Sequence, residues 1–149
     1  MIEVILEDER WEAVGLEALC GPAEQEALAV TGRTPAGFEI ALLGCDDARI
    51  AVLNHDFRGK EAATNVLSWP TSATPPMEGG ELGDIAIAYE TCMREAKEKG
   101  ISVHNHVTHL VIHGVLHLLG YDHISDTDAE KMEALEIKAL AKLGVSNPY

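Results

Sequence analysis

The stretch His109–His123, HLVIHGVLHLLGYDH, carries the most specific chemical pattern in the chain. Its apolar residues recur with helical periodicity, which predicts a largely buried helix. Residues four apart lie on the same helix face, so three imidazoles form one row there: His109, His113 and His117. A glycine that can end the helix, Gly120, precedes a further histidine, His123. The stretch therefore predicts a histidine-bearing helix ended by a turn.

Three of these histidines have the spacing of a metal site. His113 and His117 can bring their ring nitrogens within ~3–4 Å of each other, as a tetrahedral zinc ion requires. His109 cannot join them, because it lies ~12 Å from His117 along the helix axis. Gly120 can adopt a positive φ, and this turn returns His123 to the pair. The pattern H-x-x-x-H-x-x-G-x-x-H thus predicts one zinc ion on His113, His117 and His123, with water at an open fourth position.

The alternative is an ordinary helix that happens to carry histidines on its surface or in the core. A single histidine would favour that interpretation, but three with this glycine placement favour the metal site. For His109 two interpretations stay open. It either orients a metal ligand or faces the substrate, or it is an ordinary polar residue whose hydrogen bonds are satisfied. Three histidines are not at ligand spacing and are taken as ordinary: His55, His104 and His106.

The same spacing occurs in the metzincin proteases, H-E-x-x-H-x-x-G-x-x-H. Gly114 occupies the position of their catalytic glutamate. A peptidase needs that carboxylate as its general base. Cleavage of a phosphodiester depends less on a carboxylate base when a metal activates the nucleophile and cations stabilise the developing charge. The pattern therefore favours a hydrolase other than an ordinary protease.

Composition indicates one soluble domain over residues 1–149, which is long enough to bury a core. The hydrophobic fraction of 46% and the charged fraction of 24% are typical of globular proteins. Three dispersed cysteines argue for a reducing compartment, and the chain shows neither a signal peptide nor a membrane span, so we expect a cytoplasmic protein. A net charge of −14 is unusual for a nucleic-acid binder, since phosphate contacts need a basic surface.

The remaining periodicity predicts an α/β (α+β) fold in which a mixed, roughly four-stranded sheet packs with five to six helices, one of them the metzincin-like histidine helix. Strands are expected at Ile2–Leu6, Gly37–Leu43, Asn65–Trp69 and Leu82–Ala88. Helices are expected around Trp11–Leu19, Pro22–Gly32, Asp46–Gly59, Tyr89–Lys99, Ser102–Gly120 and from Asp126 onward. Gly21-Pro22 is expected to separate the first two helices, and Thr71–Glu81 is expected to be a loop.

Three motifs together resemble the YbeY family of bacterial endoribonucleases and ribosomal RNA maturation factors. In chain order they are LNHDFRGKEAATNVLSWP (Leu53–Pro70), LGDI (Leu82–Ile85) and HGVLHLLGYDH (His113–His123). The resemblance is specific from Asp46 to Asp126 and only general outside that range. It implies a single-domain, zinc-dependent endoribonuclease that acts on the 3′ end of small-subunit ribosomal RNA and in ribosome quality control.

The resemblance also implies roles for individual residues. His113, His117 and His123 match the family's metal-binding histidines, and Arg58 matches an arginine that faces the metal cleft. A guanidinium can hold a phosphate bidentately, so Arg58 is assigned to substrate positioning or transition-state stabilisation. Four neighbours receive lesser roles: Lys60 as a weaker phosphate contact, Asn65 and Ser68 as supports of their strand, and Asp84 in structure or in orienting a ligand.

Three hypotheses follow. The first is a zinc-dependent endoribonuclease specific for single-stranded RNA, whose nucleophile is either water or a ribose 2′-hydroxyl. Its expected partners are precursor small-subunit ribosomal RNA and the ribosome or its proteins, which could recruit so acidic an enzyme. The second is a metallohydrolase of a peptide or amide, which Gly114 disfavours. The third is a non-enzymatic ribosome-assembly factor stiffened by its metal, which an open coordination position disfavours.

Overall fold

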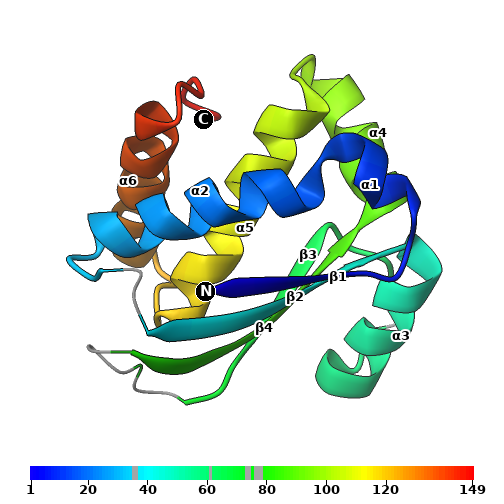
Figure 1. Cartoon of the computed structure of the whole chain (residues 1–149), viewed down its shortest axis with the longest axis horizontal. Coiled ribbons are helices and arrows are strands. Elements are labelled where there is room, and N and C mark those ends of the chain that lie inside the picture. Colours follow the sequence, from blue (N-terminus) through cyan, green and yellow to red (C-terminus); the bar gives the residue numbers. More distant parts are fainter. Residues whose placement is uncertain (35–36, 61, 73–74, 76–78) are drawn as a thin grey trace.

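The computed structural model describes residues 1–34, 37–60, 62–72, 75 and 79–149. In these residues the elements follow in the order that the periodicity predicts (Figure 1). They are β1 (Ile2–Leu6), α1 (Arg10–Val14), α2 (Leu16–Val30), β2 (Phe38–Cys45), α3 (Asp47–Arg58), β3 (Val66–Pro70), β4 (Gly80–Ala88), α4 (Tyr89–Lys99), α5 (Val103–Leu118) and α6 (Asp126–Lys142).

The strands form one four-stranded sheet in the order β1-β2-β4-β3. The first three of these strands are parallel, and β3 pairs antiparallel with β4 at one edge of the sheet. The prediction of a mixed α/β sheet is therefore confirmed. Helix α5 contacts both β3 and β4, so the histidine helix lies over the edge where the antiparallel strand is added.

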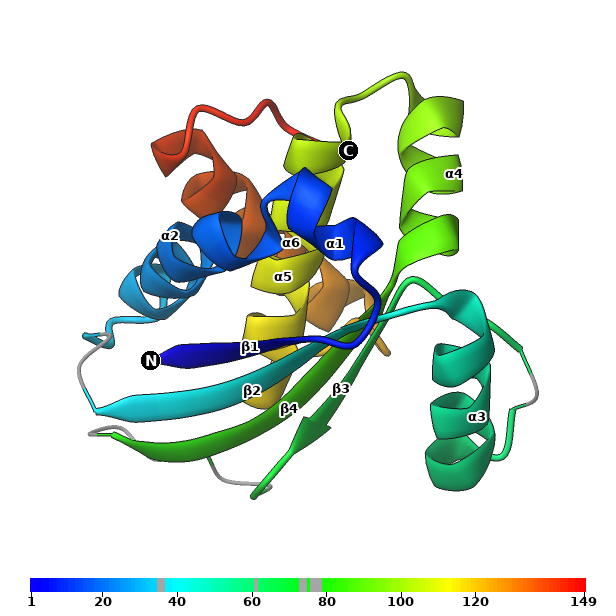
Figure 2. The same cartoon turned by 45° about the vertical axis from the view of Figure 1, so that its right-hand side comes forward.

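The two faces of the sheet are covered unequally (Figure 2). One face carries the main core, in which buried residues of β2 and β4 pack against α2, α5 and α6. Among the described residues, α3 covers the other face, and its Ile50 packs in a small cluster with Cys45, Leu67, Ala86 and Ala88. Helices α3 and α5 therefore lie on opposite faces of the sheet.

The boundary between the first two helices was predicted at the wrong place. Helix α1 ends at Gly15, which has φ +77°, and α2 then runs without interruption through Gly21 and Pro22. A proline inside a helix costs about 3 kcal/mol, because it removes one hydrogen bond and crowds the preceding turn. Burial of one face of α2, including Leu16, Leu19 and Ala23, offsets that cost.

Other boundaries differ by a few residues. Strand β2 extends to Cys45, β3 includes Pro70, and β4 already begins at Gly80. Part of the predicted loop Thr71–Glu81 lies outside the described residues, and its last two positions belong to β4. The three cysteines are buried and free. No helix in the described part of the chain has the length and apolar character needed to cross a membrane.

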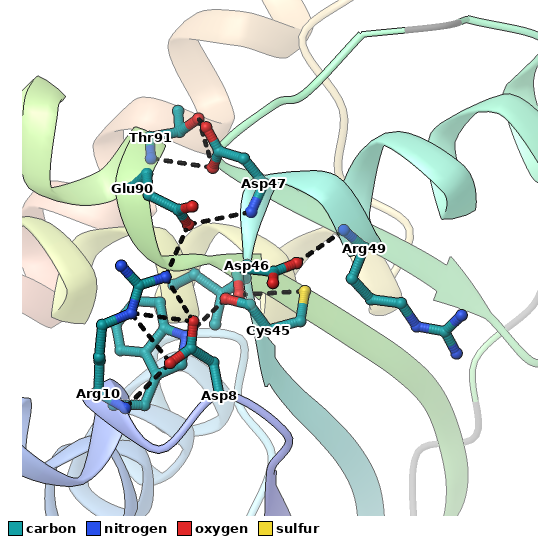
Figure 3. A network of polar contacts seen from close by, with 10 residues as sticks. Asp8, Arg10, Cys45, Asp46, Asp47, Arg49, Glu90 and Thr91 are labelled. Carbon is teal, nitrogen blue, oxygen red and sulfur yellow. Dashed lines mark hydrogen bonds and ion pairs between the residues drawn. The ribbon is translucent and has the colours of Figure 1, made fainter.

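A network of polar contacts anchors the start of α3 to α4 (Figure 3). The Asp47 carboxylate accepts hydrogen bonds from the backbone N–H and the hydroxyl of Thr91, at 3.0 and 2.9 Å. Asp46 caps α3 by accepting from the Arg49 N–H at 2.8 Å, as its sequence position predicts. Arg10 is held by Asp8 and lies 3.2 Å from Glu90. The network fixes the direction of α3, and Arg10 is held in it by ion pairs with Asp8 and Glu90.

Candidate metal centre

Helix α5 is buried along most of its length, and a glycine lets it approach the sheet closely. Ser102 caps its N-terminus by accepting from the Asn105 N–H at 3.1 Å. A Cβ atom at Gly114 would lie 3.1 Å from Cδ1 of Ile85 on β4, which is closer than side chains normally pack. Gly114 therefore brings the histidine face down beside β4, and the position of the metzincin glutamate has little room for a larger side chain.

The three predicted ligands converge. Ring nitrogens of His113, His117 and His123 all lie within 4.8 Å of one another, and the Nε2 atoms of His113 and His117 are 3.0 Å apart. Gly120, with φ +95°, turns the chain after α5 and so brings His123 back to the helix. The group can hold a metal ion through three imidazoles.

Burial prepares His117 to act as a ligand. Desolvation, aided by the neighbouring His113 and His123, lowers its pKa to about 4. The ring is therefore neutral near pH 7 and offers a nitrogen lone pair, which an imidazolium cannot do. A hydrogen bond to the Tyr121 backbone opposes this shift and ties the ring to the turn that carries His123.

A carboxylate from α6 orients His113 from behind. Glu136 is 1% exposed, and its Oε2 lies 2.8 Å from Nδ1 of His113. Its Oε1 lies 2.5 Å from Nε2 of His109 and also accepts from the Tyr149 hydroxyl. Burial would raise the pKa of Glu136, but the hydrogen bonds from His109, His113 and Tyr149 lower it to about 2.

This ionised carboxylate decides which nitrogen His113 presents. Because a carboxylate only accepts hydrogen bonds, Nδ1 of His113 must carry the proton, and Nε2 is left free toward His117. Metal-binding histidines commonly have such a partner on their second nitrogen, which fixes the tautomer and the ring orientation. Of the two roles left open for His109, the structure supports the orienting one, exerted through Glu136.

Replacing Glu136 with glutamine should weaken metal binding. Glutamine has a single acceptor oxygen for three donors, so the proton on Nδ1 of His113 is no longer enforced. We expect a loss of zinc affinity of about 10- to 100-fold, as for other residues that orient metal ligands. Competition with a chelating dye measures it, and Glu130→Gln is the control, because Glu130 lies exposed on the same helix. Equal affinity of both variants would contradict the role assigned to Glu136.

The triad opens into a cleft of about 520 Å³ between α3, β3 and α5. Its walls include Gly114, Asp122, Ile124 and side chains of β3, and Phe57 and Arg58 lie at the end of α3. Arg58 makes no hydrogen bond or ion pair with another residue among those that the structure describes. Arg49 of the same helix, in contrast, lies 3.4 Å from Glu7. Arg58 is thus a cation available to a ligand in the metal cleft.

The residues given lesser roles divide into two groups. Asn65 donates to Glu95 at 3.0 Å and accepts from the Val66 N–H at 2.6 Å, so it supports its strand as expected. Ser68 lines the cleft, and no hydrogen bond to its hydroxyl is formed within the described residues. Lys60 is exposed and is not among the described residues that line the cleft.

Asp84 does not orient a metal ligand. It pairs with Trp69 across β3 and β4, next to Ile85, whose side chain faces Gly114. Successive side chains of a strand point to opposite faces, so Asp84 points away from α5. It lines a separate apolar hollow with Ile5 on the other face of the sheet. That part of the expectation for Asp84 is wrong.

Two features of the site were not predicted. Glu136 lies between Met132 and Leu140 at intervals of four on the buried stripe of α6, where a charged residue is out of pattern. That break could have indicated a buried carboxylate with partners. Phe57, in contrast, fits the apolar pattern of α3, and nothing in the sequence distinguishes it from a core residue.

Comparisons with known proteins agree with this geometry. The sequence profile of the family described as Endoribonuclease YbeY matches residues 7–144. The chain belongs to the YbeY family. Among its relatives, the Endoribonuclease YbeY of Dinoroseobacter shibae is 49% identical over 99% of this chain and 90% of its own length. The Endoribonuclease YbeY of Cereibacter sphaeroides is also 49% identical, over 100% of this chain and 98% of its own.

The solution structure of TM1509 from Thermotoga maritima shares the fold. It superimposes with a TM-score of 0.62 at 24% identity, covering 97% of this chain and 92% of that protein. The resemblance found in the motifs is therefore confirmed at the level of the YbeY family and its fold. The roles of Arg58 and the three histidines stay predictions, which their convergence on one cleft supports.

Proposed function

We propose that this YbeY-family protein is a zinc-dependent endoribonuclease that cleaves single-stranded RNA, with the 3′ region of precursor small-subunit ribosomal RNA as its substrate. The observation that carries the proposal is the convergence of His113, His117 and His123 at one cleft with Arg58, which has no partner among the described residues. The names of the relatives, Endoribonuclease YbeY, support the same reaction class.

The donor set fits zinc. Three imidazole nitrogens within 4.8 Å of one another suit a borderline divalent ion and leave a coordination position for water or substrate. A bound zinc ion would supply Lewis acidity and lower the pKa of water or of an alcohol. The Glu136 carboxylate and the low pKa of His117 keep two of the three ligands in the form that binds such an ion.

The chain's own residues supply the remaining functions. Arg58 would hold the phosphate through two parallel hydrogen bonds and stabilise the charge that develops when phosphorus is attacked. Gly114 takes the place of the glutamate that a metzincin peptidase uses as its base. This favours phosphodiester cleavage over the alternative of a peptide or amide hydrolase.

The acidic surface bears on the partners. With a net charge of −14, the chain repels RNA at long range, and the cleft offers Arg58 as its cation within the described residues. We therefore propose that the ribosome or its proteins bring enzyme and substrate together, and that the protein acts in ribosome maturation and quality control in the cytoplasm. A non-enzymatic assembly factor remains the second candidate, since the Glu136 network would also make a metal stiffen the fold.

Removal of the metal should abolish cleavage reversibly. Protein dialysed against a chelator is expected to lose cleavage of a precursor small-subunit ribosomal RNA, because the Lewis acid is absent. Addition of one equivalent of zinc should restore it, and gel analysis of labelled RNA measures both states. Nickel and manganese additions test the identity of the ion. If the zinc-loaded protein binds the RNA but never cuts it, the assembly-factor hypothesis replaces the nuclease.

A further inference from the structure

Two large apolar side chains lie exposed at the metal cleft. Phe57, in the last turn of α3, is 64% exposed, and Ile124, in the segment between α5 and α6, is 89% exposed. Both line the cleft that contains the histidine triad. Apolar surface exposed to water is unfavourable, so side chains of this size gathered at one cleft indicate an apolar ligand.

The Phe57 ring is held in place rather than mobile at the end of a helix. It packs against Trp69 of β3 with ring centroids 5.3 Å apart and an interplanar angle of 61°. The helix that carries it is anchored at its other end by the polar network around Asp47 (Figure 3). Gly59 ends the helix with φ +69° directly after Arg58. The Phe57 ring therefore has a defined position next to Arg58, the residue proposed to bind the phosphate.

We propose that Phe57 is the stacking platform for one unpaired nucleobase next to the scissile phosphate, with Ile124 as the apolar contact on the cleft. This rests on the proposed RNA substrate and names the part of it that the cleft recognises. A nucleobase presents an apolar π-face together with polar edges. Within the described residues, the hydroxyls of Thr64 and Ser68 line the same cleft and have no hydrogen-bond partner.

A stacking platform at Phe57 would select single strands. A base in a duplex is stacked on its neighbours and paired along its edge, so it cannot reach an aromatic ring in a cleft without being flipped out. Stacking on protein aromatics tolerates any base, because every base has a π-face. The platform would therefore select unpaired RNA without selecting sequence.

The competing explanation is that Phe57 only shields a neighbouring apolar hollow. That hollow, of about 350 Å³, is lined by Leu43, Leu53 and Trp69 as well as Phe57. If Phe57 only shields this hollow, its replacement changes the stability of the protein and leaves the affinity for RNA unchanged.

The test combines Phe57 variants with RNA that lacks single bases. A short single-stranded RNA containing one cleavage position is bound to the metal-free protein, so that binding is measured without cutting. A series of the same RNA carries one abasic nucleotide at each position in turn. Anisotropy of the labelled RNA reports binding. Val52→Ala is the matched control, since Val52 is 49% exposed on the same helix but does not line the cleft.

We expect Phe57→Ala to weaken binding about 5- to 150-fold, the range found when one stacking aromatic is removed. Phe57→Trp and Phe57→Tyr should restore it, while Val52→Ala should bind like the unchanged protein. An abasic nucleotide at one position of the RNA should lower the affinity of the unchanged protein by the same factor. It should not lower the affinity of Phe57→Ala any further. In cleavage by the zinc-loaded protein, the loss should appear mainly in KM.

The inference is overturned if Phe57→Ala binds the RNA as tightly as Val52→Ala. It is also overturned if every abasic position lowers the affinity of both proteins equally, or if thermal stability falls while RNA affinity stays unchanged. Such results would leave RNA cleavage by the unchanged protein intact. An unchanged protein that neither binds nor cuts the RNA would instead refute the proposed function itself.

Discussion

His113→Ala is expected to lose stoichiometric zinc and, with it, cleavage of precursor ribosomal RNA. His113 is the ligand whose Nε2 faces His117 and whose Nδ1 is held by Glu136, so its removal takes away both a ligand and the partner of a buried carboxylate. Because residues that only orient ligands cost about 10- to 100-fold in metal affinity, loss of a ligand should cost more than about 100-fold. Metal analysis of the purified protein and chelator competition measure the effect.

His104→Ala is the matched control for this variant. His104 is exposed near the start of the same helix and is not one of the three converging histidines. It should retain one zinc ion and full cleavage. His113→Ala removes a partner of the buried Glu136 and His104→Ala does not, so the fold of both variants must be checked. Circular dichroism should show that both are folded. Cleavage by zinc-free His113→Ala at the unchanged rate would remove the metal centre from the mechanism.

Arg58→Ala is expected to lower the rate of cleavage about 100- to 1,000-fold while the protein keeps its zinc. The guanidinium is exposed in the cleft and free of protein partners among the described residues, so its loss should not disturb the fold. Preorganised groups that stabilise developing charge contribute factors of this size. Single-turnover cleavage with saturating enzyme measures the chemical step, and zinc content is measured on the same sample.

Arg58→Lys and Arg49→Ala complete that experiment. A lysine keeps the charge but not the two parallel hydrogen bonds, so it should recover only part of the rate. Arg49 lies on the same helix but is engaged by Glu7, and its alanine variant should cleave normally. A decrease in RNA affinity without a decrease in the single-turnover rate would assign Arg58 to substrate binding alone.

Much of the fold could be predicted from local sequence signals. Asp46 and Ser102 are residue types favoured at the N-cap and cap their helices, and Gly59 and Gly100 end theirs in the left-handed conformation. The order of strands and helices follows from periodicity alone. The break between the first two helices was predicted at Gly21-Pro22 and lies at Gly15, because burial of a helix face outweighed the local cost of a proline.

The metal triad was predictable for a related reason. Two of its members are one helical turn apart, and the third follows a glycine three residues later, so all of the information lies within His113–His123. The residues that serve the triad come from distant parts of the chain. Glu136 reaches it from α6, and Arg58 and Phe57 reach it from α3 across the sheet edge.

The sequence by itself therefore determined the order of the elements and the three converging imidazoles, because helix geometry and a single turn are local properties. Only the tertiary structure decided that Glu136 holds His113, that Asp84 points to the opposite face, and that Phe57 stays exposed at the cleft. Those outcomes depend on how α3, α5 and α6 pack against the two faces of the sheet. Packing between segments far apart in the chain is not encoded in the periodicity of any one of them.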